Sequence, residues 1–328
     1  MAFGSGSESV TKVAGAEPEG SVSGGRKRGL LRQIWRGRVW YAFALPPFAL
    51  LVLFVGYPTF VTFRQSFFRP IGRDEEFAGL RQYEQLAANP VFWGALGNTV
   101  LLAVSFLIIV IPLSVVLASM VNRVRRGSAA LKVIYFLPQL TSSVAVALIF
   151  NYVFQPDWGL LNGALHGLGI EETPLWLSDP RYGLLGSRSA VTILAVWTAL
   201  GYFMLIFLAG LQSIPIDLYE AAALDGAGGL RIWWSITIPS LRPTLIFLVI
   251  TGTVDAMGRF SDLWTLGGPG GSPARSLQTI VMYMYQVAFE SGNVNRAAAI
   301  GVIFFVLMLC VTLVSYRSVL ASEFRKRR

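Results

Sequence analysis

The sequence predicts an all-α polytopic membrane protein with six transmembrane helices. Of its 328 residues, 54% are hydrophobic and only 14% are charged, whereas soluble domains carry about 25% charged residues. Six apolar segments approach or exceed the roughly 20 residues that a helix needs to cross a bilayer. The net charge of +9 comes from short basic clusters beside these segments. That arrangement is typical of membrane topology and argues against nucleic-acid binding.

The six predicted spans lie between residues 39 and 316. They are Val39–Phe63, Phe92–Val121, Val133–Pro156, Ala190–Leu211, Leu241–Met257 and Ala297–Tyr316. The fifth span is the shortest and is interrupted by Arg242 and Asp255. An even number of spans places both termini on the same side of the membrane.

The basic residues predict which side this is. With both termini in the cytoplasm, 18 of the 27 Lys and Arg residues lie inside and nine lie outside, as expected for a protein of the cytoplasmic membrane. Residues 1–38 lack the apolar core of a signal peptide, and we expect them to form a disordered cytoplasmic tail. Residues 39–320 form the membrane domain, and residues 321–328 form a basic cytoplasmic tail.

A polar helix is predicted at the start of the loop 213–239, between the fourth and fifth spans. Pro215 suits the first turn of a helix, where its missing N–H costs nothing. Asp217 lies in the same turn and favours the positive end of the helix dipole. Glu220 and Asp225 are its other charged members. One small apolar face is formed by Leu218, Ala221 and Ala222.

An elbow and a second helical segment follow. Residues 226–229, Gly-Ala-Gly-Gly, would be a poor helix interior but make a good turn. Helical spacing resumes at Leu230, and Pro239 is expected to end the unit. The first helix would be a rigid knob about 15 Å long, at 1.5 Å per residue. The competing interpretation is a helix lying on the membrane surface, although such helices usually carry a polar face rich in Lys and Arg.

This loop resembles the EAA loop of importer permeases of the ATP-binding-cassette (ABC) class. Their pattern is E-A-A, three residues, G, nine residues, I-x-L-P, and every spacing fits here, with Ile238 in place of Leu. The resemblance implies a coupling helix that docks in a cleft of an ATPase subunit. The residues to which it assigns this role are Asp217, Leu218, Glu220, Ala221, Ala222, Asp225, Gly226, Ile236, Ile238 and Pro239.

The resemblance covers roughly residues 40–320 and is strongest to the carbohydrate branch, the maltose and glycerol-phosphate type permeases. It rests on the six-span plan, on Gly56-Tyr57-Pro58 in the first span, and on the stretch from Phe260 through Gly267-Gly268-Pro269 to Ala297-Ala298-Ala299. It implies a type I ABC importer permease-like fold and a sugar as solute. The implied partners are a second six-span permease, an ABC ATPase dimer and an extracytoplasmic solute-binding protein.

Three alternatives to a sugar permease remain. The first is a permease for another solute, such as a polyamine, phosphate or peptide. The second is a stand-alone carrier or channel, which the EAA spacing disfavours because such a protein has no ATPase to dock. The third is a membrane enzyme, but no catalytic constellation is found. The chain also lacks a G-x-x-x-x-G-K-[ST] run, and its single histidine, His166, has no neighbouring ligand for a metal. We therefore expect no enzymatic activity, cofactor or metal.

Polar and aromatic groups in or near the spans are candidates for a substrate path. Charged residues at membrane depth face the protein interior or a water-filled path. Asp255 and Arg259 stand at i, i+4 and can pair on one helix face, which would serve either the path or the structure. The candidates are Asn151, Gln155, Trp197, Tyr202, Asp255, Arg259, Phe260 and Trp264. For each one, a contact between helices is the competing interpretation.

Overall fold

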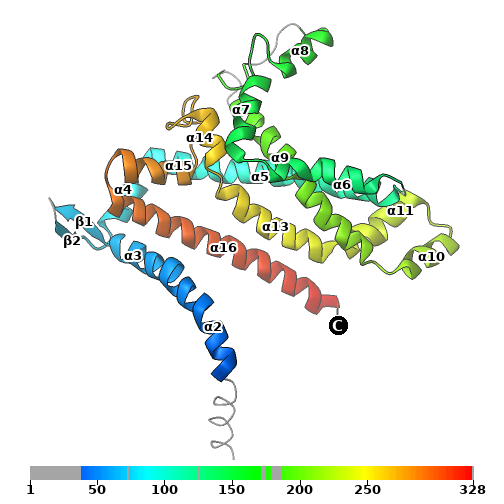
Figure 1. The fold of residues 1–328 in the computed structure, drawn as a ribbon, viewed down its shortest axis with the longest axis horizontal. Helices are drawn as coiled ribbons and strands as arrows, with labels where there is room; N and C mark the ends of the chain where they lie inside the picture. The colour runs from blue at the N-terminus through cyan, green and yellow to red at the C-terminus, as the bar shows by residue number, and fades with distance from the viewer. Residues whose placement is uncertain (1–37, 72–73, 125, 171–174, 179–185, 327–328) are drawn as a thin grey trace, which may run out of the picture. The chain divides into compact units, whose positions relative to one another are not determined.

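Helices dominate the computed structural model, which describes residues 38–71, 74–124, 126–170, 175–178 and 186–326 (Figure 1). The predicted N-terminal tail therefore lies outside the described residues, apart from residue 38. The chain divides into two units, residues 1–59 and 60–328.

The first predicted span is a continuous helical segment. It consists of α2 (Arg38–Leu51), the π-helical turn η1 (Val52–Gly56) and α3 (Tyr57–Gln65), whose last residues belong to the second unit. The part from residue 43 to residue 65 is long and apolar enough to cross a membrane, and none of its most apolar stretch is buried. An apolar surface on every side suits a helix surrounded by lipid or by another protein.

The second unit contains the remaining elements. They are β1 (Phe68–Ile71), β2 (Asp74–Phe77), α4 (Arg81–Ala87), α5 (Pro90–Arg123), α6 (Ser128–Phe136), the 3₁₀ turn η2 (Leu137–Leu140), α7 (Ser143–Val153), α8 (Leu160–Gly167), α9 (Ser187–Gln212), α10 (Ile216–Leu224), α11 (Gly229–Ile232), the π-helical turn η3 (Trp233–Thr237), α12 (Ile238–Ser240), α13 (Arg242–Met257), α14 (Ser261–Gly267), α15 (Ile280–Tyr285), the π-helical turn η4 (Gln286–Glu290) and α16 (Val294–Lys326). The antiparallel hairpin β1–β2, which pairs Phe68 with Phe77, is an addition to the predicted all-α plan.

The predicted spans are largely recovered. Four described helices are long and apolar enough to cross a membrane, and the number rises to six if each of two bent pairs is one span. The second, fourth and sixth predictions fall within α5, α9 and α16. Helix α16 also continues through residues 321–326, so the predicted basic tail is helical as far as it is described.

The third span is not the single helix that we predicted over Val133–Pro156. Helix α6 with η2 and helix α7 are bent by 98° relative to each other. Pro138 lacks an N–H for the helical ladder, and the Thr141 hydroxyl donates to the carbonyl of Leu137 at 3.3 Å. Thr141 itself is extended. Serine and threonine side chains compete for backbone hydrogen bonds in this way, which favours a break.

The core of the second unit lies between α5, α9 and α13, with α6 and α16 packed around it. Phe106 of α5 meets Phe203 of α9 edge to face, with 5.7 Å between ring centroids. Gly201 allows α9 to approach α6 closely, because a Cβ there would overlap the backbone carbonyl of Tyr135. Such small residues at helix contacts are characteristic of membrane proteins.

Candidate functional site

The first candidate site is α10, the first helix of the predicted coupling loop. None of its residues is buried, and Leu218 and Leu224 are 46% and 90% exposed. Among the residues that the structure describes, Asp217, Glu220 and Asp225 form no ion pair. Pro215 is the N-cap residue, with φ = −56° and ψ = 133°, so it lies one residue before the helix and not in its first turn as we predicted. The helix thus presents an exposed, acidic surface with an alanine-rich stripe.

The elbow after α10 is a defined helix cap. The N–H of Ala227 donates to the carbonyl of Ala222 at 3.0 Å, and the N–H of Gly226 donates to that of Ala223 at 3.1 Å. This pair of bonds is a Schellman motif, which needs a left-handed residue at its turning point. Gly226 supplies it with φ = +74°. The glycine therefore fixes the direction in which the chain leaves the helix.

The second leg of the loop is attached to the core. The indole N–H of Trp233 donates to the Ser119 hydroxyl of α5 at 3.1 Å. Thr237 is buried, and its hydroxyl lies 3.2 Å from the hydroxyl of Tyr219 on α10. Ile236 and Ile238 are half-buried, and Ile238 packs against the main apolar cluster. These contacts connect the exposed helix to the membrane helices.

Pro239 does not end this leg, contrary to our prediction. The helical segment 229–240 continues through it and bends by 61° into α13 only after Ser240. The reason lies in the preceding π-helical turn, η3, where the N–H of Ile238 donates to the carbonyl of Trp233. A local π turn changes the bonding pattern that a proline ring would otherwise disrupt.

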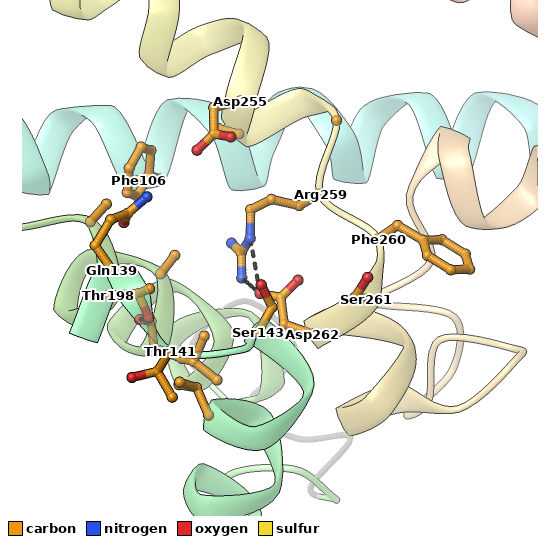
Figure 2. Close-up of a pocket in the computed structure, with 16 residues that line it drawn as sticks. Phe106, Gln139, Thr141, Ser143, Thr198, Asp255, Arg259, Phe260, Ser261 and Asp262 are labelled. Carbon is orange, nitrogen blue, oxygen red and sulfur yellow. Dashed lines mark hydrogen bonds and ion pairs between the residues drawn. The ribbon is translucent and has the colours of Figure 1, made fainter. Parts of the chain in front are cut away.

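The second candidate site is a cavity of about 240 Å³ at the break of the third span (Figure 2). The segment from η2 to α7 forms one wall, and α9, α13 and the start of α14 form the others. Its polar lining consists of Gln139, Thr141, Ser143, Thr198, Asp255, Arg259, Ser261 and Asp262. These groups offer hydrogen-bond donors and acceptors beside an apolar wall that includes Phe106.

The predicted Asp255–Arg259 pair is wrong. Helix α13 ends at Met257, so Arg259 lies beyond its last turn and the i, i+4 geometry does not apply. The guanidinium of Arg259 instead pairs with Asp262, with Nε 3.0 Å from Oδ2. Its Nη2 also donates to the carbonyl of Val191 at 3.3 Å. Asp255 lines the same cavity without an ion pair among the described residues (Figure 2).

The aromatic candidates occupy different surroundings. Phe260 lines the cavity, and its ring centroid lies 5.2 Å from that of Trp264, which does not line the cavity. Trp197 contacts Phe150 at 5.3 Å and faces a separate groove. Tyr202 packs against the main apolar cluster. Only one of these four rings therefore reaches the cavity.

The two amide candidates bond to each other. The side-chain amide of Gln155 donates to Asn151 Oδ1 at 3.2 Å, near the end of α7, and neither residue lines the cavity. Sequence reasoning missed the remaining polar lining residues, which are Gln139, Thr141, Ser143, Thr198, Ser261 and Asp262. The available signal was the run Pro138-Gln-Leu-Thr-Ser-Ser143, which places polar groups inside an apolar span.

The cavity presents the hydrogen-bonding groups that a polar solute needs. In the described part of the chain, no group of three His, Cys, Asp or Glu side chains is arranged to hold a metal ion. The Arg259 and Asp262 charges compensate each other, which leaves hydroxyl, amide and carboxylate groups for a ligand. A hydrated solute loses water on entering such a site and needs these partners in exchange.

Comparison with known proteins identifies relatives along most of the chain. Residues 110–328 match the family described as binding-protein-dependent transport system inner membrane component. The chain is 32% identical over 289 residues to the lactose transport system permease protein LacF of Rhizobium radiobacter, covering 87% of this chain and 94% of that protein. It is 30% identical over 285 residues to the sn-glycerol-3-phosphate transport system permease protein UgpA of Agrobacterium fabrum, covering 85% and 94%.

Two solved structures share the fold. A chain of a bacterial ABC transporter involved in the import of the acidic polysaccharide alginate matches with a TM-score of 0.76 at 24% identity, covering 88% of this chain and 97% of that one. A bacterial alginate ABC transporter in complex with an alginate pentasaccharide-bound periplasmic protein matches with a TM-score of 0.73 at 25% identity, covering 87% and 95%. These matches confirm the predicted type I importer permease fold.

Proposed function

Because the chain belongs to the family of binding-protein-dependent transport system inner membrane components, we propose that it is a permease subunit of an ATP-driven sugar importer. It is a non-catalytic membrane component, and ATP hydrolysis takes place in a separate subunit. The proposal rests on the loop that begins with α10. This helix is exposed, has the EAA spacing and ends in a Schellman cap, and the segment that follows the cap is attached to the core.

Helix α10 acts as the coupling helix. Its unpaired carboxylates favour a cleft lined by basic or polar groups, and Ala221 and Ala222 allow a partner backbone to approach closely. Motion of the ATPase then reaches the membrane helices through the contacts of Trp233 and Thr237. Since Gly226 sets the angle between the two legs, it determines how the motion is transmitted.

The cavity at the break of the third span is this subunit's part of the translocation path. Asp255 is an acceptor for sugar hydroxyls, because its carboxylate forms no ion pair with another described residue and can accept several hydrogen bonds. Gln139, Thr141 and Thr198 add groups that donate and accept. Phe260 contributes an apolar surface at the edge of the cavity. The Arg259–Asp262 pair holds the start of α14 against α9.

A carbohydrate is the solute that these features favour. LacF is named as a lactose transport permease, and the lining groups suit a neutral, hydroxyl-rich molecule. A permease for a polyamine, phosphate or peptide is the alternative within the same class. A polar cavity of about 240 Å³ has room for part of an oligosaccharide at a time.

The working transporter contains further subunits. One six-span chain provides half of a path, so a second EAA-bearing permease forms the other half. Two ATPase copies bind the two coupling helices, and an extracytoplasmic solute-binding protein delivers the sugar. One of the similar solved structures is a transporter in complex with a periplasmic protein. The excess of Lys and Arg on one side of the predicted spans supports a cytoplasmic position for both termini and for α10.

Cysteine cross-linking in native membranes tests this proposal. The chain has one cysteine, Cys310, so Cys310→Ser provides a clean background for Ala221→Cys in α10. We expect Ala221→Cys to cross-link to an ATPase subunit, and Glu76→Cys in the hairpin to react only with a reagent added from outside. Cross-linking of Glu76→Cys rather than Ala221→Cys to the ATPase would contradict both the orientation and the coupling role.

A further inference from the structure

A second cavity, of about 420 Å³, forms a groove between α5 and α9. Its α5 wall is a ridge of residues spaced four apart, from Leu101 through Ser105 to Leu113. Its α9 wall extends from Arg188 to Leu200. Each wall spans twelve residue steps, or about 18 Å of helix. This length is comparable to half of the roughly 30 Å hydrocarbon core of a bilayer.

Most of the groove is apolar, because the hydroxyl groups of two lining residues, Ser105 and Thr192, already form hydrogen bonds within their own helices. The hydroxyl of Ser105 donates to the carbonyl of Leu101 at 2.8 Å. The hydroxyl of Thr192 donates to the carbonyl of Arg188 at 2.7 Å. Both side chains therefore turn their polar atoms to their own helix. The rim is formed by bulky, exposed side chains, including Ile109, Ile193 and Trp197.

One end of the groove carries a positive charge. Arg188 is held in place by two neutral acceptors: its Nη2 donates to Asn98 Oδ1 at 2.7 Å, and its Nε donates to the carbonyl of Ser276 at 3.2 Å. No carboxylate pairs with it among the described residues. The guanidinium is thus fixed by the fold while its charge is left uncompensated. A phosphate group is a suitable counter-ion, since arginine binds phosphate with directed hydrogen bonds.

We propose that this groove is a binding site for an anionic phospholipid. The headgroup phosphate binds Arg188, and one acyl chain lies along the apolar groove between α5 and α9. With both termini in the cytoplasm, α9 begins on the outer side, so the lipid belongs to the outer leaflet. On the cytoplasmic side of membranes, basic pockets between helices bind lipid headgroups by the same chemistry.

The composition of the groove favours a lipid over a helix from a partner protein. Helix contacts in membranes are rich in small residues that let backbones approach. Here the rim residues Ile109, Leu113, Ile193 and Trp197 are bulky and hold another backbone away. A flexible acyl chain fits between such side chains. The proposal does not depend on the identity of the transported solute.

Trp197 provides a direct reporter, because bromine atoms on a lipid chain quench a nearby indole. The complete transporter is reconstituted in phosphatidylcholine vesicles that contain increasing amounts of brominated phosphatidylglycerol or brominated phosphatidylcholine. The difference between the unmodified and the Trp197→Phe transporter gives the signal of this tryptophan, whatever the other eight in this chain and those of the other subunits contribute. We expect brominated phosphatidylglycerol to quench the Trp197 signal saturably, at a several-fold lower mole fraction than brominated phosphatidylcholine.

Two variants separate the headgroup contact from the acyl contact. Arg188→Gln should remove the preference for phosphatidylglycerol, whereas Arg81→Gln, an exposed arginine on α4, should keep it. Ser105→Leu fills the groove floor without altering Arg188 and should weaken quenching by both lipids. Equal quenching by the two lipids in the unmodified transporter would overturn the proposal. Absence of Trp197 quenching would also overturn it and would indicate that protein covers the groove.

Discussion

The replacement Gly226→Val tests whether the elbow after α10 transmits motion. Gly226 has φ = +74°, and no neighbouring atom lies within 4 Å of a Cβ placed there. Any effect of the substitution therefore comes from the backbone conformation rather than from a steric clash with other residues. A β-branched residue in the left-handed region is strongly disfavoured.

The size of the expected effect follows from the free-energy cost of this left-handed conformation for a residue other than glycine. The left-handed region costs an L-residue roughly 1–2 kcal/mol, which shifts an equilibrium by about 5- to 30-fold. Gly226→Val should therefore favour an uncapped elbow, in which the two Schellman hydrogen bonds to Ala222 and Ala223 are broken. Gly226→Asn should have a smaller effect, because asparagine visits this region more readily.

The chain contains a matched control two residues away. Gly228 is also exposed and also has open space around a Cβ, but its φ is −69°. Gly228→Val adds the same side chain to the same loop without backbone strain in the left-handed region. The assay is ATP hydrolysis stimulated by the solute-binding protein, together with solute uptake, in the reconstituted transporter. Membrane insertion is checked by the amount of protein extracted.

We expect stimulated hydrolysis and uptake to fall several-fold in Gly226→Val, with normal insertion, and to change little in Gly228→Val. The reasoning fails if Gly226→Val retains full coupling. It also fails if the two valine variants are impaired equally, since the loss would then come from side-chain bulk on the loop and not from the conformation of Gly226.

Three further predictions concern the cavity and the core. Asp255→Asn should reduce uptake and leave assembly intact, because Asp255 lines the cavity and forms no ion pair with another described residue. A lower yield of complex, measured by size exclusion, would show a structural role instead. Asp262→Asn should reduce the yield of assembled complex. Removing one partner of the nearly buried ion pair with Arg259 costs about 3–5 kcal/mol of stability. A normal yield together with normal thermal stability would refute this prediction. Gly201→Ala should lower thermal stability, because the added methyl group overlaps the backbone carbonyl of Tyr135, and an unchanged melting temperature would disprove the close contact.

Much of the fold was predictable because the bilayer imposes a simple pattern. Long apolar segments such as α5 and α9 must be helical in lipid, where every backbone polar group needs an internal partner. The exposed elbow was predictable as well, since the glycines at 226–229 are a local signal. Both features depend on residues that are close in the sequence.

The breaks in the helices were harder to predict. The kink at Thr141 arises from competition between side-chain and backbone hydrogen bonds, and Pro239 is accommodated by a π turn. Hydropathy does not distinguish these cases, because proline is tolerated within some membrane helices. The only local indication of a break is the polar character of residues 138–143, which interrupt an otherwise apolar span.

The ion pair of Arg259 could not be predicted from spacing alone. An i, i+4 interval supports a contact only within one continuous helix, and α13 ends two residues before Arg259. The position of Asp262 depends on where α14 begins, which is set by packing between segments distant in sequence. For the same reason, Thr198 of α9 and Gln139 of η2 were not recognised as members of one cavity.

Coupling of ATP hydrolysis to the entry of a sugar can be measured in proteoliposomes that contain the chain, its partner permease and its ATPase, supplied with the loaded solute-binding protein. We predict that labelled oligosaccharide accumulates only when ATP and the binding protein are both present, and that Gly226→Val lowers the rate. Uptake by this chain alone, without an ATPase, would contradict the account.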